Sequence, residues 1–202
     1  MVAFWRRWLP QKRVQLSIGE GAELRQLTMQ DVTALYELTV RNRERLRRWM
    51  AWVEHVRREE DTRGFVRESL RSFRAGRGLQ MGIWWNHRLV GTIGLFRTGG
   101  TGVAEIGYWI DEMAEGHGLV TRAVRAMTQY AFEQWQIPAV RIRVEPENLR
   151  SRAIPERLGF RLREQIEEDG ADGSRRTLLV YLMEASEFLG EHGAEDETTT
   201  SL

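Results

Sequence analysis

Residues Asp111 to Ala123 read Asp-Glu-Met-Ala-Glu-Gly-His-Gly-Leu-Val-Thr-Arg-Ala, and they join an apolar strand to an amphipathic helix. Two glycines, Gly116 and Gly118, stand there with one residue between them. Because glycine has no Cβ, backbone N–H groups can approach an anion closely, and the positive end of the helix dipole lies at the same point. The stretch indicates either a phosphate-binding loop or a tight strand-to-helix turn, and the rest of the chain must decide between them.

The segments on both sides of this stretch carry the apolar periodicities of strands and helices. Apolar residues at every second position predict strands, and apolar residues three or four apart predict helices. The predicted strands cover residues 22–27, 79–85, 89–95, 103–110, 140–145, 160–167 and 176–183. The predicted helices cover residues 28–45, 61–76, 116–135 and 148–158. The predicted order is β-α-α-β-β-β-α-β-α-β-β, which indicates an α/β fold.

Local signals mark where several of these elements begin. Thr28 and Asp31 have the spacing of a capping box at the start of the first helix. Asp61 or Thr62 can cap the second helix. Residues 86–88, Asn-His-Arg, separate two apolar runs and predict the turn of a hairpin.

The composition limits the chemistry and the partners of the chain. Its 202 residues favour one domain, which we place at residues 21–188, between an N-terminal extension at 1–20 and a flexible tail at 189–202. The formal net charge of +1 provides no global attraction for nucleic acid or an anionic membrane. The chain contains no cysteine, which excludes a thiolate nucleophile and fits a cytoplasmic protein. We expect no membrane span and no metal site, because apolar runs are short and the histidines lack ligand spacing.

Two further stretches carry a family resemblance. Residues 105–111 read Glu-Ile-Gly-Tyr-Trp-Ile-Asp, and residues 145–160 read Glu-Pro-Glu-Asn-Leu-Arg-Ser-Arg-Ala-Ile-Pro-Glu-Arg-Leu-Gly-Phe. With the element order and the glycine loop, they resemble the GCN5-related N-acetyltransferase (GNAT) family. The second stretch is similar to the Asn-x-x-Ser-x-x-x-x-Glu-x-x-Gly-Phe segment of the RimJ/RimL branch, whose enzymes acetylate protein N-termini, including those of ribosomal proteins. The likeness spans residues 24–184.

The resemblance implies a fold, a cosubstrate and a reaction. The fold is a mixed, mostly antiparallel sheet of about seven strands, splayed between the fourth and fifth strands and flanked by about four helices. The reaction is transfer of an acetyl group from acetyl-CoA to a primary amine by direct attack, without a metal. A protein α-amine has a reference pKa of about 7.7–8.0, so a modest base is sufficient, which favours the N-terminus of a protein such as a ribosomal protein as acceptor.

The resemblance also implies which residues contact acetyl-CoA. Strand backbone would pair with the pantetheine, loop amides would hold the diphosphate, and an asparagine would orient this neighbourhood. These residues are Tyr108, Trp109, Ile110, Gly116, His117, Gly118, Leu119, Val120, Thr121 and Asn148. Glu115 departs from the family pattern, and its charge should weaken binding unless the side chain turns outward or caps the helix. Val120 also departs, being larger than glycine or alanine, and its N–H stays free if the side chain enters the core.

For catalysis, the resemblance implies that Ser151 protonates the leaving thiolate. Serine and asparagine are also common caps at a helix start, so capping stays an alternative for Ser151 and Asn148. The candidate bases are Glu105, Glu168 and Asp169. Glu105 lies on a strand and can line the cleft or pair with an arginine. Trp49 and Trp52 can wall the acceptor site or belong to the core.

Several alternatives stay open at this point. Another acyl donor, such as succinyl-CoA, would need a cation near the thioester, for which Arg141 and Arg143 are available. A small amine would serve as acceptor in the same fold, because acceptor pockets are built from variable loops. A non-catalytic CoA-binding pseudoenzyme is suggested by the two departures in the loop. Direct nucleic-acid binding would rest only on residues 41–48, where Glu44 interrupts the arginines. The choice between a monomer and a homodimer is also open.

Overall fold

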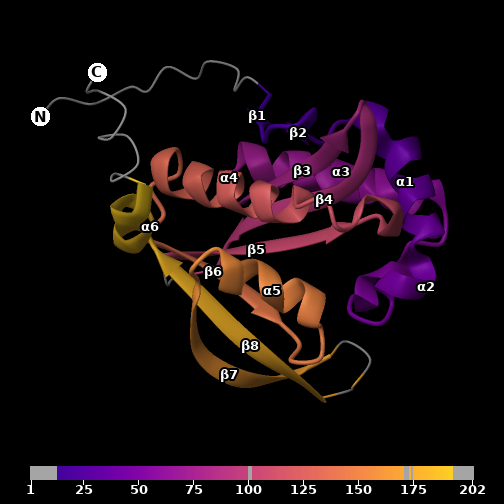
Figure 1. Cartoon of the computed structure of the whole chain (residues 1–202). Helices are drawn as coiled ribbons and strands as arrows, with labels where there is room; N and C mark the ends of the chain where they lie inside the picture. Colours follow the sequence, from indigo (N-terminus) through magenta and orange to yellow (C-terminus); the bar gives the residue numbers. More distant parts are fainter. Residues whose placement is uncertain (1–12, 100–101, 171–172, 174, 193–202) are drawn as a thin grey trace, which may run out of the picture.

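A computed structural model describes residues 13–99, 102–170, 173 and 175–192 (Figure 1). Its strands are β1 (Gln15–Ser17), β2 (Ala22–Gln26), β3 (Gly78–Trp85), β4 (Arg88–Arg97), β5 (Val103–Ile110), β6 (Ala139–Val144), β7 (Arg161–Asp169) and β8 (Arg175–Glu184). Its α-helices are α1 (Val32–Arg41), α2 (Arg43–Leu46), α3 (Glu59–Arg74), α4 (Leu119–Glu133), α5 (Leu149–Arg157) and α6 (Ala185–His192). Short 3-10 helices are η1 (Met29–Asp31), η2 (Ala51–His55) and η3 (Glu112–Ala114). None of the helices in the described ranges is both long and apolar enough to cross a bilayer.

The strands form one sheet that opens in its middle. The strand order is β1-β2-β3-β4-β5-β6-β8-β7, and every neighbouring pair is antiparallel except β5 and β6. These two parallel strands pair only over Val103–Glu105 and Ala139–Arg141. Beyond Glu105 they separate, which confirms the splay that the family resemblance implied. The resulting gap is the feature of the fold that positions the site.

Helices cover both faces of the sheet, and strand β5 contributes to both cores because its side chains alternate. Ile106 belongs to the larger core with Met127 of α4, and both side chains are almost fully buried. Trp109 belongs to the smaller core with Leu35 of α1 and Val66 of α3. Figure 1 shows α4 lying along the strands, while the β7–β8 hairpin extends away from the body of the molecule.

The predicted capping signals have mixed outcomes. The capping box is confirmed, since the amide of Thr28 donates to Asp31 Oδ2 at 2.8 Å, although it starts the 3-10 turn η1 that precedes α1. The prediction for the second helix is wrong, because α3 begins at Glu59. Asp61 is its third residue and accepts from the amides of Arg57 and Arg58, each at 2.9 Å. The hydrogen bond from Arg58 leads the causes that lower the pKa of Asp61.

Other differences lie at loops and ends. The hairpin turn contains two residues, Asn86 and His87, both with positive φ, which suits the twist of the flanking strands. The first predicted helix is divided at Asn42 into α1 and α2. Strand β1 was not predicted and lies inside the predicted N-terminal extension, and helix α6 runs past the predicted boundary at residue 189. Residues 1–12 and 193–202, which hold most of the predicted extension and tail, lie outside the described residues.

Candidate active site

A cleft lies where β5 and β6 separate, with a volume of about 130 Å³. Its walls come from the two strands, β8, the start of α5 and the segment after α2. The lining residues are Trp49, Met50, Ile106, Gly107, Tyr108, Ile142, Arg143, Val144, Glu145, Asn148, Ser151 and Leu178. Four of the predicted site residues, Trp49, Tyr108, Asn148 and Ser151, therefore meet in this cleft, although they come from separate segments of the chain.

The backbone of β5 presents alternate residues to the gap. The amide of Asp111 donates to the carbonyl of Val90 at 2.6 Å, and the amide of Thr98 donates to the carbonyl of Val103 at 3.0 Å. Hydrogen-bonding direction alternates along an antiparallel pair. The backbone N–H and C=O groups of odd-numbered β5 residues therefore point to β4, and those of even-numbered residues point to the gap.

This alternation corrects part of the expected contact set. Ile106 and Tyr108 turn their backbone groups toward the gap, whereas Trp109 turns its backbone to β4, contrary to expectation. The carbonyl of Ile110 accepts a hydrogen bond from Arg45 Nη2, so this group already has a partner. The strand edge open to an extended ligand is therefore centred on Ile106 and Tyr108.

The glycine loop after β5 forms an uncapped helix start. Gly116 and Gly118 have φ values of +82° and +66°, which residues other than glycine rarely adopt. Helix α4 begins directly after Gly118, and no side chain of the described residues caps it there. Val120 lies in the core with 8% of its surface exposed, so its side chain does not cover the loop. The loop therefore suits an anion, whose charge would face the helix dipole and the N-terminal amides.

Other predicted loop residues are held by side-chain contacts. The exposed ring of His117 packs on Trp85, with ring centroids 4.5 Å apart. The hydroxyl of Thr121 accepts from Arg157 Nη1 at 3.1 Å. His117 is not among the residues that line the cleft.

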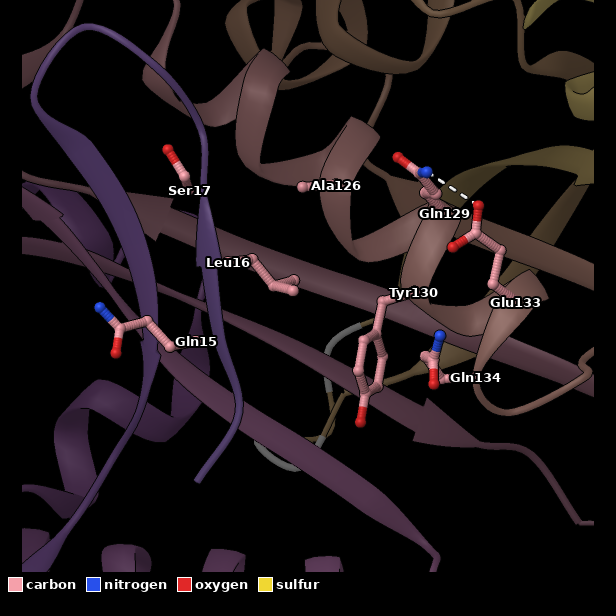
Figure 2. Close-up of a pocket in the computed structure, with 8 residues that line it drawn as sticks. All are labelled: Gln15, Leu16, Ser17, Ala126, Gln129, Tyr130, Glu133 and Gln134. Atoms are coloured by element: carbon pink, nitrogen blue, oxygen red, sulfur yellow. Dashed lines mark hydrogen bonds between the residues drawn. The ribbon is translucent and has the colours of Figure 1, made fainter. Parts of the chain in front are cut away.

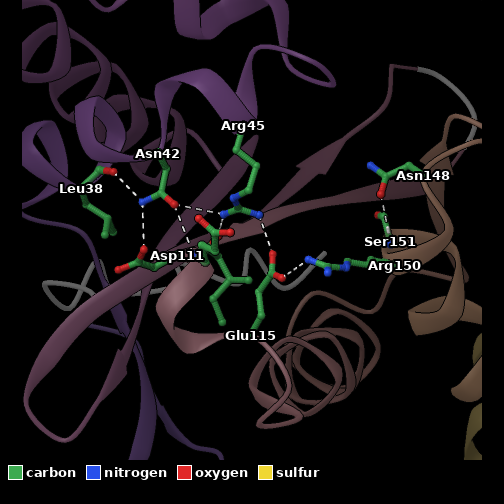
Figure 3. Close-up of polar contacts among 10 residues, drawn as sticks. Leu38, Asn42, Arg45, Asp111, Glu115, Asn148, Arg150 and Ser151 are labelled. Atoms are coloured by element: carbon green, nitrogen blue, oxygen red, sulfur yellow. Dashed lines mark hydrogen bonds and ion pairs between the residues drawn. The ribbon is translucent and has the colours of Figure 1, made fainter.

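Glu115 points at two arginines rather than outward into solvent or onto the helix start. Its Oε1 lies 2.5 Å from Arg45 Nη1, and its Oε2 accepts from Arg150 Nη1 (Figure 3). Arg45 belongs to α2 and Arg150 to α5, so this carboxylate joins two elements on either side of the glycine loop. The sequence analysis considered an outward-turned or helix-capping side chain, and the folded protein instead pairs this charge with two arginines.

A buried polar network connects α1 to the end of β5, and sequence reasoning missed it. Asp111 is 4% exposed and accepts from Arg41 Nη2 and, at 3.1 Å, from Asn42 Nδ2. The Oδ1 atom of Asn42 accepts from the amide of Glu112 at 3.1 Å. Buried polar groups need such partners, so the network fixes the point where β5 ends and the loop begins.

Ser151 and Asn148 have different local roles. Asn148 caps α5, because its Oδ1 accepts from the amide of Ser151 at 3.2 Å, so the capping alternative holds for Asn148. Ser151 lies inside the first turn, and its hydroxyl donates to the hydroxyl of Tyr108 at 3.3 Å. The Tyr108 hydroxyl donates in turn to the carbonyl of Ser151 at 3.0 Å. Ser151 therefore presents a hydroxyl that is paired with a second hydroxyl in the cleft.

Burial raises the pKa of Tyr108 well above its ordinary value of 10.0, and a hydrogen bond from Ser151 opposes this only partly. Above pH 10 the unfolded chain releases this proton while the folded protein keeps it, so stability falls as pH rises. We expect Tyr108→Phe to show a shallower fall. Urea unfolding of both proteins from about pH 8 to about pH 11 measures the difference, and equal slopes above pH 10 would contradict it. Tyr130 and Tyr181 also have raised pKa values, but both proteins retain them.

The predicted bases lie outside the cleft lining. Glu105 takes the arginine alternative, since its Oε2 accepts from Arg141 Nε and Arg143 Nε, both at 2.9 Å. Glu168 Oε1 accepts from Arg143 Nη1 at 2.7 Å, and Asp169 is exposed at the end of β7. The carboxylate that does line the cleft is Glu145.

Glu145 is a site residue that sequence reasoning missed. Its Oε1 lies 3.4 Å from Arg176 Nη1, and it follows directly after β6. The signal was present, because Glu145 continues the alternation that places Arg141 and Arg143 on one face of the strand.

The two tryptophans that were predicted for the acceptor site separate in the structure. Trp49 lines the cleft. Trp52 is 43% exposed, and its ring centroid lies 6.4 Å from that of Trp109, so it covers the smaller core from outside. Of the two, only Trp49 is placed to contact a molecule in the cleft.

A larger hollow of about 380 Å³ lies between β1 and α4 (Figure 2). Its lining residues are Gln15, Leu16, Ser17, Ala126, Gln129, Tyr130, Glu133 and Gln134. The single charged side chain among them, Glu133, accepts from Gln129 at 2.8 Å. Size alone does not decide between the two sites, and the smaller cleft is the candidate active site because hydroxyls, a carboxylate and free strand edge meet there.

Comparisons with known proteins agree with this geometry. Residues 22–161 match the family described as an acetyltransferase (GNAT) domain. YdaF of Bacillus subtilis (strain 168), provisionally named a ribosomal N-acetyltransferase, is 33% identical over 178 residues, which cover 86% of this chain and 97% of that protein. The ribosomal-protein-serine acetyltransferase of Escherichia coli (strain K12) is 28% identical over 146 residues, covering 72% of this chain and 82% of that protein.

A solved structure shares the fold at lower sequence identity. It is the RimL ribosomal L7/L12 α-N-protein acetyltransferase in complex with coenzyme A, with a TM-score of 0.81 and 22% identity. The match covers 86% of this chain and 99% of that one. The matched domain, the relatives and the splayed sheet lead to one conclusion: this chain belongs to the GNAT family of acetyltransferases.

Proposed function

We propose that this protein transfers an acetyl group from acetyl-CoA to the N-terminal α-amine of a protein, such as a ribosomal protein. The observation that carries the proposal is the cleft at the β5–β6 gap, where Ser151, Tyr108 and Asn148 meet. The names of the relatives support a ribosomal-protein acceptor. We place the reaction in the cytoplasm, where a ribosomal substrate would be met, and a homodimer stays a prediction.

The residues present fit acetyl-CoA. The backbone edge at Ile106 and Tyr108 would hold the pantetheine as an added strand, and the loop from Gly116 to Thr121 would hold the diphosphate. The core position of Val120 supports this assignment, because its side chain leaves the loop amides accessible. Acetyl-CoA, when bound, supplies the activated acetyl group and a thiol leaving group.

The reaction needs two proton transfers, one from the attacking amine and one to the departing sulfur. The attacking α-amine must lose one, and a neutral amine forms readily near its reference pKa of about 7.7–8.0. Candidate bases are Glu105, Glu168, Asp169 and Glu145, of which Glu145 lines the cleft. The hydroxyl of Ser151 is placed to donate the second proton to the departing sulfur, with Tyr108 holding it in position at 3.3 Å.

The alternatives lose support for specific reasons. Of the two cations considered for a succinyl group, Arg141 binds Glu105, and Arg143 lines the cleft but already binds Glu105 and Glu168. Burial lowers the pKa of Arg143, and these two hydrogen bonds more than offset that, so it stays charged and paired. Glu115 and Val120, which suggested a pseudoenzyme, are accounted for by an ion pair and a core position.

Two measurements test the proposal. Calorimetric titration with acetyl-CoA, succinyl-CoA and CoA should give micromolar binding with preference for the acetyl donor over the succinyl donor. Thiol release should then occur with a peptide that contains an internal lysine and has a free N-terminus. It should be absent when the N-terminus of the same peptide is blocked, so that the lysine is the remaining amine. Failure to bind any of the three ligands, or acetylation of only the blocked peptide, would contradict the proposal.

A further inference from the structure

The ion pair between Glu115 and Arg150 joins the segment before the glycine loop to the first turn of α5, which carries Ser151. Glu115 directly precedes the loop that starts α4, and Arg150 stands next to Ser151 in the first turn of α5 (Figure 3). A ligand whose diphosphate sits on the α4 start and whose thioester reaches Ser151 must pass beside this pair. The pair is therefore positioned to respond to such a ligand.

The two arginines that contact Glu115 are anchored to different degrees. The Arg45 side chain is 31% exposed, and it also donates to Asn42 Oδ1 at 3.1 Å and to the carbonyl of Ile110. The Arg150 side chain is 81% exposed, and its guanidinium contacts Glu115 alone among the described residues. Arg45 is thus fixed by several partners, whereas Arg150 can move at little cost because an exposed ion pair is weak.

We propose that Arg150 binds the diphosphate of acyl-CoA and exchanges its contact with Glu115 for that diphosphate. This inference rests on the proposed function, since it takes acyl-CoA as the ligand. Arginine binds phosphate oxygens through two parallel hydrogen bonds, and a diphosphate attracts it more strongly than one carboxylate. Glu115 keeps its contact with Arg45 during the exchange, so the carboxylate is not left without a partner.

The proposal fixes the sign of each substitution. Glu115 competes with the diphosphate for Arg150, so Glu115→Gln releases the arginine and should tighten CoA binding about threefold to fivefold, the size of an exposed ion pair. Arg150→Gln removes a charged hydrogen bond to the ligand and should weaken binding about tenfold. When Arg150 is already replaced by glutamine, adding Glu115→Gln should have little further effect on CoA binding, because the arginine for which Glu115 and the diphosphate compete is absent.

The test is the dissociation constant for CoA, measured by calorimetry at one fixed ionic strength. The four proteins compared are the unsubstituted protein, Glu115→Gln, Arg150→Gln and the double variant. Glu112→Gln is the matched control, since Glu112 is exposed three residues earlier and no described arginine pairs with it. We expect this control to leave the dissociation constant nearly unchanged. Unfolding midpoints within about 2 °C of one another would show that all variants are folded.

A second ligand separates the diphosphate from the other phosphate of CoA. Dephospho-CoA keeps the diphosphate and lacks the 3′-phosphate, so the weakening by Arg150→Gln should persist with it. Loss of that effect would assign Arg150 to the 3′-phosphate and overturn the proposal. Unchanged or weaker CoA binding by Glu115→Gln would also overturn it, showing that Glu115 only positions Arg150. If the unsubstituted protein bound neither ligand, the proposed function itself would fail, a result distinct from these.

Discussion

Replacement of Ser151 by alanine is expected to lower kcat for acetyl transfer about 100-fold, the lower end of the contribution made by a positioned proton donor. The dissociation constant for acetyl-CoA should change little, because the strand edge at Ile106 and Tyr108 and the glycine loop are untouched. Steady-state kinetics with a free N-terminal peptide, together with calorimetry of the donor, separates the two effects.

Ser69→Ala is the matched control for this substitution. Ser69, like Ser151, lies in a helix and has a hydroxyl with a hydrogen-bond partner, here the carbonyl of Val66 at 2.8 Å. It belongs to α3 and does not line the cleft. We expect its kinetics to match those of the unsubstituted protein. Unchanged kinetics for Ser151→Ala across the pH range would remove Ser151 from the mechanism and leave Tyr108 as the hydroxyl of the cleft.

Replacement of Gly91 by alanine is expected to destabilise the fold by about 3 kcal/mol, the upper range for overpacking. A Cβ at Gly91 would collide with the carbonyl oxygen of Trp109 and lie 2.9 Å from the Cα of Ile110. These are backbone atoms of β5, so relief requires the strand that borders the cleft to move. Thermal unfolding should show a midpoint lower by about 10 °C.

Gly107→Ala is the control for this prediction, because it makes the same change in the adjacent strand. No described atom lies within 4 Å of a Cβ at Gly107, so the unfolding midpoint should stay within about 2 °C. Gly107 lines the cleft, so its methyl group should weaken acceptor or donor binding instead. Equal stability losses in the two variants would show that the β4–β5 spacing is not the cause.

Much of the fold could be predicted because its signals are local. Strand β5 has the predicted bounds of residues 103 and 110, since an apolar alternation is followed by the glycine loop. Strand β1 was missed because it has three residues, of which only Leu16 is apolar. Its strand character comes from pairing with β2, a contact that its own sequence does not signal.

The candidate site was predicted less completely than the fold. Ser151, Asn148 and Tyr108 were found through the family resemblance, and all three line the cleft. Trp109 was predicted to turn its backbone groups toward the pantetheine, but they point to β4. The direction depends on the register of β5 with β4, which the sequence does not show. Glu145 was overlooked, because the alternation that puts it on the same face as Arg141 and Arg143 does not by itself show that this face lines the cleft.

The sequence by itself determined the order of the main elements from β2 to β8, the glycine loop at the start of α4 and the serine in α5, because each depends on residues that are neighbours along the chain. Tertiary structure alone decided how the charges of the site are arranged. Arg45 and Glu115 are 70 positions apart, and Arg150 and Glu115 are 35 positions apart. An ion pair depends on the distance between side chains in the folded protein, and only the packing of α2 and α5 around the loop brings these charges together.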